Sequence, residues 1–529
     1  MLKLLYSSRI WIQLTARCSS GERRRRESGN VFDDQIRVGV AIGFFVKKKS
    51  SKVSKIHYQA VPDYANSEEK RSFVASTHLS KRQFDLIVPD KDGNWIGLAE
   101  NSWEELVPVA DKKSKSAKRT VQERAIFKLF SLGVVTARDE WVYDFDPVEL
   151  KRKVRHLIAH YNDDLDKFKE ISASATFADD LDYSIKWTRA IKRDLRLGKR
   201  HYYDDDLVRS AIYRPFTSCK IYFSNELNEV VYQQRDIFGW NYDNHSIVFD
   251  VSGKPFSVIA VDVLPDYHVL GDGTNLPLYR YTKDGTRIDN ITDWGLKQFQ
   301  ARYESPSPLA GEGPAKPGMR GRRPKARTAE LAGADPSSGA SRHLLPQKEK
   351  GRKISKDDIF HYVYGVLHDP VYREKYAINL KREFPRLPFY PDFWVWAEWG
   401  QRLMDLHIGY ETVEPWPLTR HDQPPGEADP LPKLKANKDN GTIILDTVTT
   451  LGGIPAACWD YRLGNRSGLE WILDQYKEKK PKDKTIAAKF NTYRFKDYKE
   501  KVIGLLARVT RVSVETMAII DAMKTAKRG

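Results

Sequence analysis

The hydrophobic pattern of the N-terminal half changes between the two-residue period of strands and the longer period of helices. Apolar residues at every second position from Ile36 to Val46 predict a buried strand that ends at Lys47. Basic amphipathic helices are predicted for residues 147–168 and 182–197. The same reasoning gives further strands at 54–60, 220–223, 246–250 and 256–261, and short helices at 66–73 and 291–303.

The pattern breaks at residue 304. Residues 304–353 contain no Ile, Val, Phe, Tyr or Trp and are rich in Pro, Gly, Ala and Arg, which predicts a disordered insert. After the insert the chain becomes mainly helical, beginning with a capping box formed by Ser355 and Asp358. Helices are predicted at 359–368, 371–384, 393–406, 467–479 and 495–524, with one strand at 443–445. These elements together predict an α+β fold.

Composition limits the classes of protein to consider. The 529 residues include 88 Lys and Arg against 71 Asp and Glu, a net charge of +17 that favours a polyanionic partner, although spread charge can also serve solubility alone. No apolar run is long enough to cross a bilayer. Three distant cysteines, Cys18, Cys219 and Cys458, give no disulfide framework, and we expect a cytoplasmic location.

The first 29 residues differ in texture from the rest. Residues 1–21 contain no acidic residue, and four arginines follow at Arg23–Arg26. Such a composition is typical of a mitochondrial transit peptide, and equally of a stretch that is foreign to the protein. We favour the foreign origin.

Motifs for catalysis are missing from the sequence. It contains no phosphate-binding loop of the Walker type, no strand-linked GxGxxG, no nucleophile elbow and no HExxH. His156 and His160 lie one helical turn apart, but without a third ligand an ordinary helix face is the better interpretation than a metal site. We therefore predict no catalytic residue, metal or cofactor in this chain, which leaves open whether it is an enzyme.

What remains is binding chemistry, in which basic residues stand beside planar side chains. Tyr213 and Arg214 precede a strand that carries Lys220, and a guanidinium with aromatic support can read a guanine edge or clamp a phosphate. The alternative is a turn fixed by Pro215 in which Arg214 forms a structural salt bridge. Arg138 lies in a similar polar loop.

Further basic candidates lie on predicted helices and loops. Lys186, Arg189 and Arg193 are expected on one face of the helix at 182–197, where they would follow a nucleic-acid backbone or simply face solvent. Two other groups suit phosphate or base contacts. They are a basic–aromatic corner of Lys381, Arg382, Arg386 and Tyr390, and a loop around Gly464 with Arg462, Asn465 and Arg466.

Several long segments resemble, in this order, the C-terminal part of type ISP restriction-modification enzymes. The first, at 30–33 and 37–42, resembles the late strand of an N6-adenine methyltransferase domain. The others are 127–134, 213–216, 359–370, 406–411 and 459–467. The resemblance runs from about residue 30 to the end, apart from the insert.

The resemblance implies a division of the chain. We expect a basic N-terminus (1–29), the tail of a methyltransferase domain with remnant strands (30–110), a mixed α/β target recognition domain (111–303), the insert (304–353) and a mainly helical part of the specificity region (354–529). In the family, one polypeptide joins a nuclease, a helicase-like ATPase, a methyltransferase and a target recognition domain, and uses S-adenosylmethionine, ATP and Mg²⁺. The family's S-adenosylmethionine loop and Asn-Pro-Pro-Tyr/Phe motif, which holds a flipped adenine, are absent here.

The expected function is therefore sequence-specific binding of double-stranded DNA by a truncated, non-catalytic target recognition part. Arg138, Arg214 and Arg466 are the first choices for contacting base edges, and the other cations would contact phosphates. Two alternatives stay open. The chain could work as part of a split adenine methyltransferase whose methyltransferase or helicase part is a separate chain, or it could be an inert pseudogene product.

Overall fold

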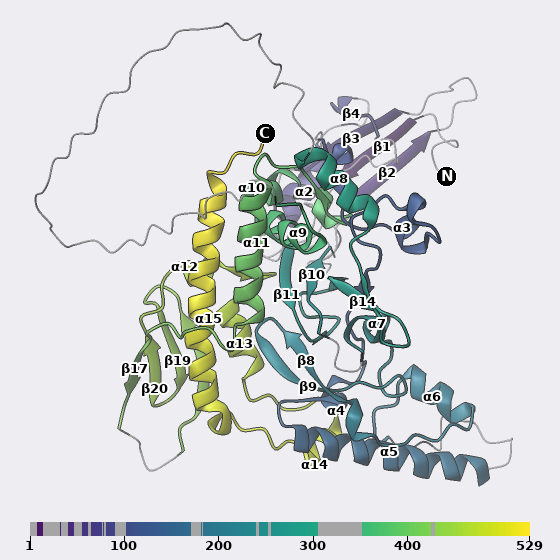
Figure 1. The fold of residues 1–529 in the computed structure, drawn as a ribbon, viewed down its shortest axis with the longest axis vertical. Coiled ribbons are helices and arrows are strands. Elements are labelled where there is room, and N and C mark those ends of the chain that lie inside the picture. The colour runs from purple at the N-terminus through teal and green to yellow at the C-terminus, as the bar shows by residue number, and fades with distance from the viewer. Residues whose placement is uncertain are drawn as a thin grey trace, which may run out of the picture.

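The computed structural model describes most of the chain from residue 102 onward and short segments before it. The described residues are 8–13, 32, 41–46, 55–61, 65–76, 78, 81–89, 102–170, 181, 183–239, 243–251, 255–304, 352–424 and 429–529. In Figure 1, helices α11 (Phe393–Ile408) and α15 (Phe495–Lys524) run along the long axis, and α5 (Pro147–Glu170) lies across one end.

A four-stranded sheet separates the two main hydrophobic cores. Its order is β11-β10-β13-β6, and Val248 of β10 pairs with Ile259 of β11 in antiparallel register. Because side chains alternate along a strand, Val248 belongs to the first core, whereas Ile247 and Phe249 belong to the second. Both faces of β10 and β11 are therefore buried. The strands are β6 (Ser131–Leu132), β10 (Ser246–Asp250), β11 (Ser257–Val261) and β13 (Thr274–Pro277).

The first core contains α5 and a second sheet of order β12-β8-β9-β7. Leu150, Val154 and Leu157 of α5 recur at helical spacing, and all three are fully buried. The elements around them are α4 (Asp139–Val142), β7 (Tyr143–Asp144), α6 (Arg189–Arg196), η5 (Asp205–Leu207), β8 (Val208–Arg214), β9 (Thr217–Tyr222), α7 (Gln234–Phe238) and β12 (Leu264–Pro265).

The second core depends on a close approach of α9 (Lys356–His368) and α11. A Cβ atom at Gly400 would lie 1.8 Å from the backbone oxygen of His361, and one at Gly365 would lie 2.3 Å from that of Trp396. Only glycine fits at both positions. Neighbouring elements are η3 (Trp103–Glu105), β5 (Val107–Pro108), α3 (Lys112–Ser116), η4 (Thr120–Gln122), β14 (Tyr279–Tyr281), β15 (Arg287–Asp289), α8 (Asp293–Tyr303), α10 (Pro370–Lys375), η6 (Asn379–Lys381) and β16 (Arg386–Leu387).

Buried His407 joins the two cores through polar contacts. Its Nδ1 lies 2.5 Å from the Tyr364 hydroxyl, and its Nε2 lies 2.9 Å from Thr516 Oγ1 and 3.0 Å from the Tyr461 hydroxyl. Tyr364 belongs to the second core and Tyr461 to the first. Burial lowers the pKa of His407 to about 3, so the ring is neutral in the folded protein.

The C-terminal region contains more strand than the sequence predicted. An antiparallel sheet of order β17-β20-β19-β18 lies beside α15 (Figure 1), and only its strand β19 was predicted. In β18 a single residue, Leu434, is buried, so the alternation that would reveal a strand is missing. The elements are β17 (Thr419–Asp422), β18 (Pro432–Asn437), β19 (Thr442–Asp446), β20 (Thr449–Gly452), α12 (Ala457–Asp460), β21 (Arg462–Leu463), β22 (Arg466–Ser467), α13 (Gly468–Gln475) and α14 (Lys484–Lys489).

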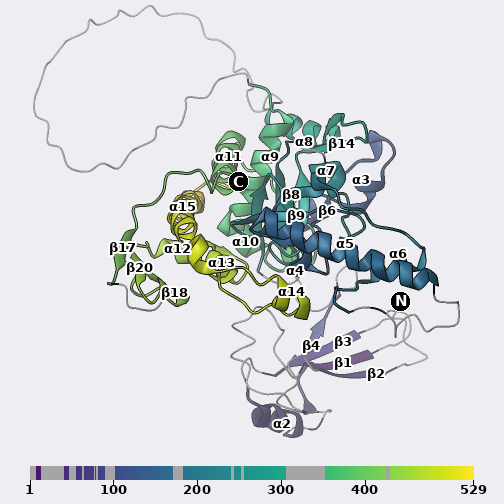
Figure 2. The same ribbon diagram turned by 90° about the horizontal axis from the view of Figure 1, so that it is seen from below.

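A separate N-terminal sheet stands apart from both cores (Figure 2). Strand β1 (Ser8–Gln13) lies between β2 (Ala41–Val46) and β3 (Lys55–Ala60), and β4 (Asp85–Ile87) and α2 (Ser67–Ala75) complete this part. The prediction of a buried strand ending at Lys47 was wrong for β2, because Phe44 and Phe45 are 42% and 48% exposed. The alternation of apolar and other residues along a strand identifies its apolar face, but it does not show whether another element covers that face. Residues 36–40 lie outside the described residues.

The α+β fold class is confirmed, and most element boundaries agree with the predictions. Helices α5 and α15 begin at the expected residues. Helix α9 begins at Lys356, three residues before the expected start, and Ser355 and Asp358 form the expected capping box. Three helices were predicted too long. The helix expected from residue 182 begins at Arg189, because Thr188 is its extended N-cap residue, and the helix expected to reach residue 384 ends at Lys375. The helix expected to reach residue 479 ends at Gln475. Residues 305–351 of the insert lie outside the described residues.

Within the described ranges, no helix combines the length and the apolar character that a membrane crossing requires.

Candidate nucleic-acid interface

The sequence-predicted contact residues fall in three places, except Lys220, which lies on strand β9. The first surrounds α4 and the N-terminus of α6 and contains six of the fourteen. The second is the corner after α10, and the third is the hairpin β21–β22. In this first place Arg138, Lys186 and Tyr213 line one cavity, and Arg214 pairs with Asp266 of the same lining. Arg189 and Arg193 lie on α6, next to Thr188, to which Arg138 donates.

The loop before α4 is held close to the segment that follows β12. Val134 donates its backbone N–H to Pro265, and Tyr267 donates to Val134. A Cβ at Gly133 would lie 2.6 Å from the backbone of Asp266, so this approach requires glycine. Ala137 has a φ of 55°, a left-handed conformation that costs a residue with a side chain about 1 kcal/mol. The loop is thus fixed in an unusual geometry at Arg138.

Arg138 lies inside the protein rather than on its surface. It is 3% exposed, and its Nη2 donates to Thr188 Oγ1, the N-cap residue of α6. Its Nε and Nη1 are buried and have no hydrogen-bond partner among the described residues. Desolvation lowers the pKa of Arg138 to about 10, and the charge of Glu229 partly offsets this. A buried cation with two unused donors is costly, and the structure retains it.

Tyr213 and Arg214 form the turn between β8 and β9 together with Phe216, which has a φ of 55°. Arg214 Nη1 lies 2.7 Å from Asp266 Oδ1, and the two side chains are 16% and 3% exposed. Tyr213 donates its hydroxyl to Asp139 at 2.9 Å, and the guanidinium of Arg214 stacks 3.9 Å from the Tyr213 ring centroid. Arg214 is therefore engaged in a structural ion pair, which is the alternative that the sequence left open.

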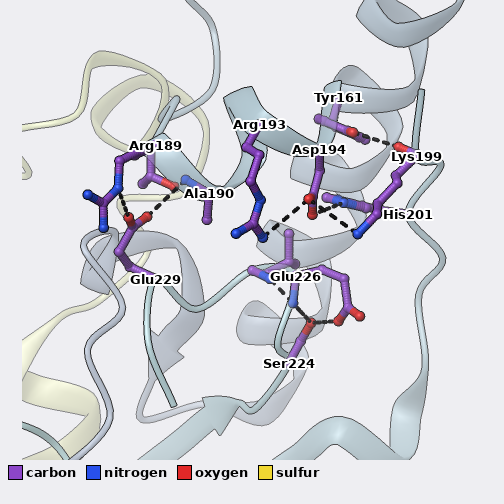
Figure 3. A network of polar contacts seen from close by, with 12 residues as sticks. Tyr161, Arg189, Ala190, Arg193, Asp194, Lys199, His201, Ser224, Glu226 and Glu229 are labelled. Atoms are coloured by element: carbon purple, nitrogen blue, oxygen red, sulfur yellow. Dashed lines mark hydrogen bonds and ion pairs between the residues drawn. The ribbon is translucent and has the colours of Figure 1, made fainter. Parts of the chain in front are cut away.

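The cations near α6 do face outward. The side chain of Arg189 is 90% exposed and contacts Glu229 at 3.2 Å, while that of Arg193 is 65% exposed and contacts Asp194 at 3.4 Å. Figure 3 shows Arg189 beside Glu229 and Arg193 beside Asp194. Lys186 is also exposed, but it precedes α6, so the expectation that it shares a helix face with Arg189 and Arg193 was wrong.

Lys220 lies on β9 and is partly buried. Its Nζ donates to Ser210 Oγ at 2.9 Å across the β8–β9 pair. This contact holds the ammonium along the strand.

The predicted basic–aromatic corner divides into buried and exposed parts. Tyr390 is 4% exposed and donates to Asp369 Oδ2 at 2.6 Å, so it serves the second core. Arg386 contacts Glu104 at 3.3 Å. Lys381 is half-buried and Arg382 is exposed, and these two remain the accessible cations of the corner.

The hairpin β21–β22 presents its polar residues around a tight turn. Gly464 has a φ of 71° and donates its N–H to Ser257 Oγ at 2.7 Å, which anchors the hairpin to β11. Arg462 and Asn465 are exposed. Arg466 stacks 4.8 Å from the Trp471 ring and lies 3.6 Å from Asp474.

A cavity of about 560 Å³ opens beside the loop that carries Arg138. Its lining joins residues far apart in the sequence, including Arg138, Lys186, Asp266 and Lys482. The sequence analysis missed Lys482. It belongs to a run with five lysines between residues 477 and 484, and that local excess of charge was a usable signal.

The loop that carries Lys482 is tied to α4. Both oxygens of the Glu140 carboxylate accept backbone N–H groups, from Lys482 and from Asp483, each at 2.9 Å. Trp141 Nε1 donates to Asp483 Oδ2 at 2.9 Å. These contacts place a lysine-rich loop against the wall of the cavity.

Candidate metal ligands do not gather in the part of the chain that the structure describes. No group of three or more His, Cys, Asp or Glu side chains there is arranged to hold a metal ion. The rings of His156 and His160 are tilted by 39° with centroids 3.8 Å apart, and the His156 ring stacks on Trp141.

Comparisons with known proteins agree on one family. Residues 125–505 match the model of the Type ISP C-terminal specificity domain. The chain is 44% identical to DrdV, whose structure was determined as a complex with DNA, with a TM-score of 0.82 over 99% of this chain and 48% of that one. No curated protein gives a significant match.

Two further structures share the fold. A nuclease-deletion mutant of the Type ISP restriction-modification enzyme LlaGI, in complex with a DNA substrate mimic, is 25% identical, with a TM-score of 0.74 over 99% of this chain and 44% of that one. The ATP-dependent Type ISP enzyme LlaBIII bound to DNA is 22% identical, with a TM-score of 0.74 over 100% of this chain and 31% of that one, and this likeness shows the fold alone. The chain thus spans less than half the length of each of these structures.

Proposed function

Because the chain belongs to the Type ISP C-terminal specificity domain family, we propose that it binds double-stranded DNA and recognises a specific base sequence as the target recognition part of a restriction-modification system. The observation that carries this proposal is the 44% identity to DrdV across 99% of the chain, because that protein was solved with DNA. The net charge of +17 supports a polyanionic partner.

The exposed cations are the expected phosphate contacts. Arg189 and Arg193 of α6 contact the carboxylates of Glu229 and Asp194, and both arginine side chains are exposed. These contacts orient the two guanidinium groups while leaving them accessible to a phosphate. Arg462 and Asn465 of the anchored hairpin are the most accessible candidates for base edges. Arg138 and Arg214, first choices from the sequence, are both turned inward, and a role for them in base contact would require these side chains to leave their buried positions.

The experiment is a salt titration of binding to short labelled duplexes. We expect the logarithm of the association constant to fall linearly with the logarithm of salt concentration, with a slope of about −0.9 for each phosphate contacted. A pool of randomised duplexes, partitioned by binding and sequenced, gives the recognised site. Binding that is absent, or enrichment of no sequence, contradicts the proposal.

A second candidate function is the DNA-recognition part of a split N6-adenine methyltransferase, which works with a separate chain that carries the catalytic motif and binds S-adenosylmethionine. The observation that favours it is the exposure of apolar residues on the N-terminal sheet, where Phe44, Leu86 and Val88 are 42%, 57% and 75% exposed. A partner would cover this surface. Methyl transfer to duplex DNA by the purified chain together with a methyltransferase chain encoded beside it, and by neither chain alone, would support this function.

A further inference from the structure

The cavity beside α4 is lined by a buried cation that has no carboxylate in direct contact. Arg138 lines this space, is 3% exposed and keeps Nε and Nη1 unpartnered among the described residues. The charge of Glu229 acts on Arg138, but the Glu229 carboxylate is itself bonded to Arg189, to the backbone N–H of Ala190 and to the Thr188 hydroxyl. A buried guanidinium with two unused donors is costly. Such a group is suited to a ligand that brings the negative charge.

The carboxylates in the lining are already engaged with protein donors. Asp139 accepts from Thr136 and Tyr213, and Asp266 accepts from Arg214 and the N–H of His268. Glu140 and Asp483 are engaged as well. Glu140 accepts two backbone N–H groups, and Asp483 accepts from the Trp141 indole and from two backbone N–H groups. The lining therefore offers a ligand few free acceptors.

The donors of the lining, in contrast, are available. Lys186 and Lys482 are exposed at the rim and form no ion pair with any residue that the structure describes. Lys482 also lies in a segment, 477–484, whose five lysines outnumber Glu478 and Asp483. The rim thus offers two ammonium donors, and Arg138 is the buried donor of the lining.

We propose that this cavity binds a phosphate group, namely a backbone phosphodiester of bound DNA, with Arg138 as the buried donor and Lys186 and Lys482 as the rim cations. The inference rests on the proposed DNA binding and assigns Arg138 to a phosphate rather than to a base edge. Thr188, which accepts from Arg138 and caps α6, couples this site to the helix that carries Arg189 and Arg193.

The test compares three variants with the wild type in the salt titration of duplex binding and in urea denaturation. Arg138→Met removes the buried charge at similar volume, so we expect unchanged or higher stability together with about tenfold weaker binding and a salt slope smaller by about one contact. Lys482→Gln should lower the slope by the same amount. Lys484→Gln is the matched control, because this exposed lysine, the first residue of α14, lies two positions from Lys482 and does not line the cavity.

Inorganic phosphate provides a test of the cavity that does not depend on DNA binding. Thermal unfolding is measured in phosphate and in chloride at equal ionic strength. A higher Tm in phosphate for the wild type, but not for Arg138→Met, shows that the cavity also accepts the free ion. No such difference, combined with the binding loss in Arg138→Met, shows that it accepts only the diester presented by DNA.

Two results would overturn the site while leaving DNA binding intact. One is wild-type affinity and salt slope in both Arg138→Met and Lys482→Gln, and the other is an equal loss in Lys482→Gln and Lys484→Gln. If the wild type binds no duplex, the proposed function fails, and the phosphate arm decides the site alone: protection that depends on Arg138 supports it, and no protection refutes it.

Discussion

The ion pair between Arg214 and Asp266 gives the sharpest prediction about the Tyr213–Phe216 turn. Replacing Arg214 with Met leaves the Asp266 carboxylate, 3% exposed, without its partner at 2.7 Å. Removing one member of a buried pair costs about 3–5 kcal/mol. We expect a loss of this size in the free energy of unfolding of Arg214→Met at pH 8, measured by urea denaturation with tryptophan fluorescence.

The loss should depend on pH in a defined direction. Burial raises the pKa of Asp266 to about 6, above its ordinary value of 3.8, even though Arg214 opposes the shift. Below pH 6 the folded protein holds a proton on Asp266, so the carboxyl group is neutral there and its ion pair with Arg214 is lost. Removing Arg214 raises the pKa of Asp266 further, because the Arg214 charge lowers it. The variant therefore gains stability relative to the wild type as the pH falls from 8 to 5.

Two further proteins complete this experiment. The double variant Arg214→Met with Asp266→Asn removes both charges and should recover most of the stability lost by Arg214→Met alone. Arg462→Met, at an exposed position, should stay within about 0.5 kcal/mol of the wild type. An Arg214→Met protein that is as stable as the wild type at both pH values, yet no longer binds DNA, would refute the reasoning and assign Arg214 to the nucleic acid.

Other positions test the helix packing, the exposed cations and the histidine network. Gly400→Ala places a Cβ 1.8 Å from a backbone oxygen of α9 and should lower the urea midpoint by the equivalent of about 3 kcal/mol or more. At the control position, the Cβ of Gly504→Ala meets only the end of an arginine side chain, and this variant should be more stable by about 0.5–1 kcal/mol. Equal midpoints would contradict the close approach. Arg189→Gln and Arg193→Gln should each reduce the salt slope of duplex binding by about 0.9 and leave unfolding within about 0.5 kcal/mol; an unchanged slope would remove α6 from the interface. His407→Leu should cost about 1–3 kcal/mol at pH 8 by leaving buried hydroxyls unpaired. The folded pKa of His407 is about 3, below its ordinary 6.5, so the unfolded chain takes up a proton that the folded protein does not. The free energy of unfolding of the wild type therefore falls by about 1.4 kcal/mol per pH unit below pH 6.5. The variant should lack this pH dependence when its urea midpoints at pH 7 and pH 5 are compared.

The sequence predicted the helices well where local signals decide them. The boundaries of α9 and α15 follow from a capping box and from an unbroken apolar period. The start of α6 was missed because residues 183–188 have helix-compatible composition, whereas the chain places Trp187 in the core and uses Thr188 as the cap. Local preference was overridden there by the burial of Ile185 and Trp187 in the first core.

The candidate contact residues were predicted as types of side chain but not as positions in space. Basic residues beside aromatic ones were visible in the sequence, and the family assignment that followed is confirmed. Which of them reach solvent was not visible, because exposure depends on partners distant in the chain. Arg214 meets Asp266, and Tyr390 meets Asp369, only in the folded protein.

The sequence by itself determined the α+β class, the family and the excess of positive charge, because period, long motifs and composition are properties of the chain alone. Tertiary structure decided which cations are available. It turned Arg138 and Arg214 inward, left Arg189 and Arg193 in solvent, and brought Lys482 to the wall of a cavity whose lining is formed mainly by residues more than two hundred positions earlier. The physical reason is that desolvation and pairing of a charge depend on every group packed around it, and those groups are assembled only by folding.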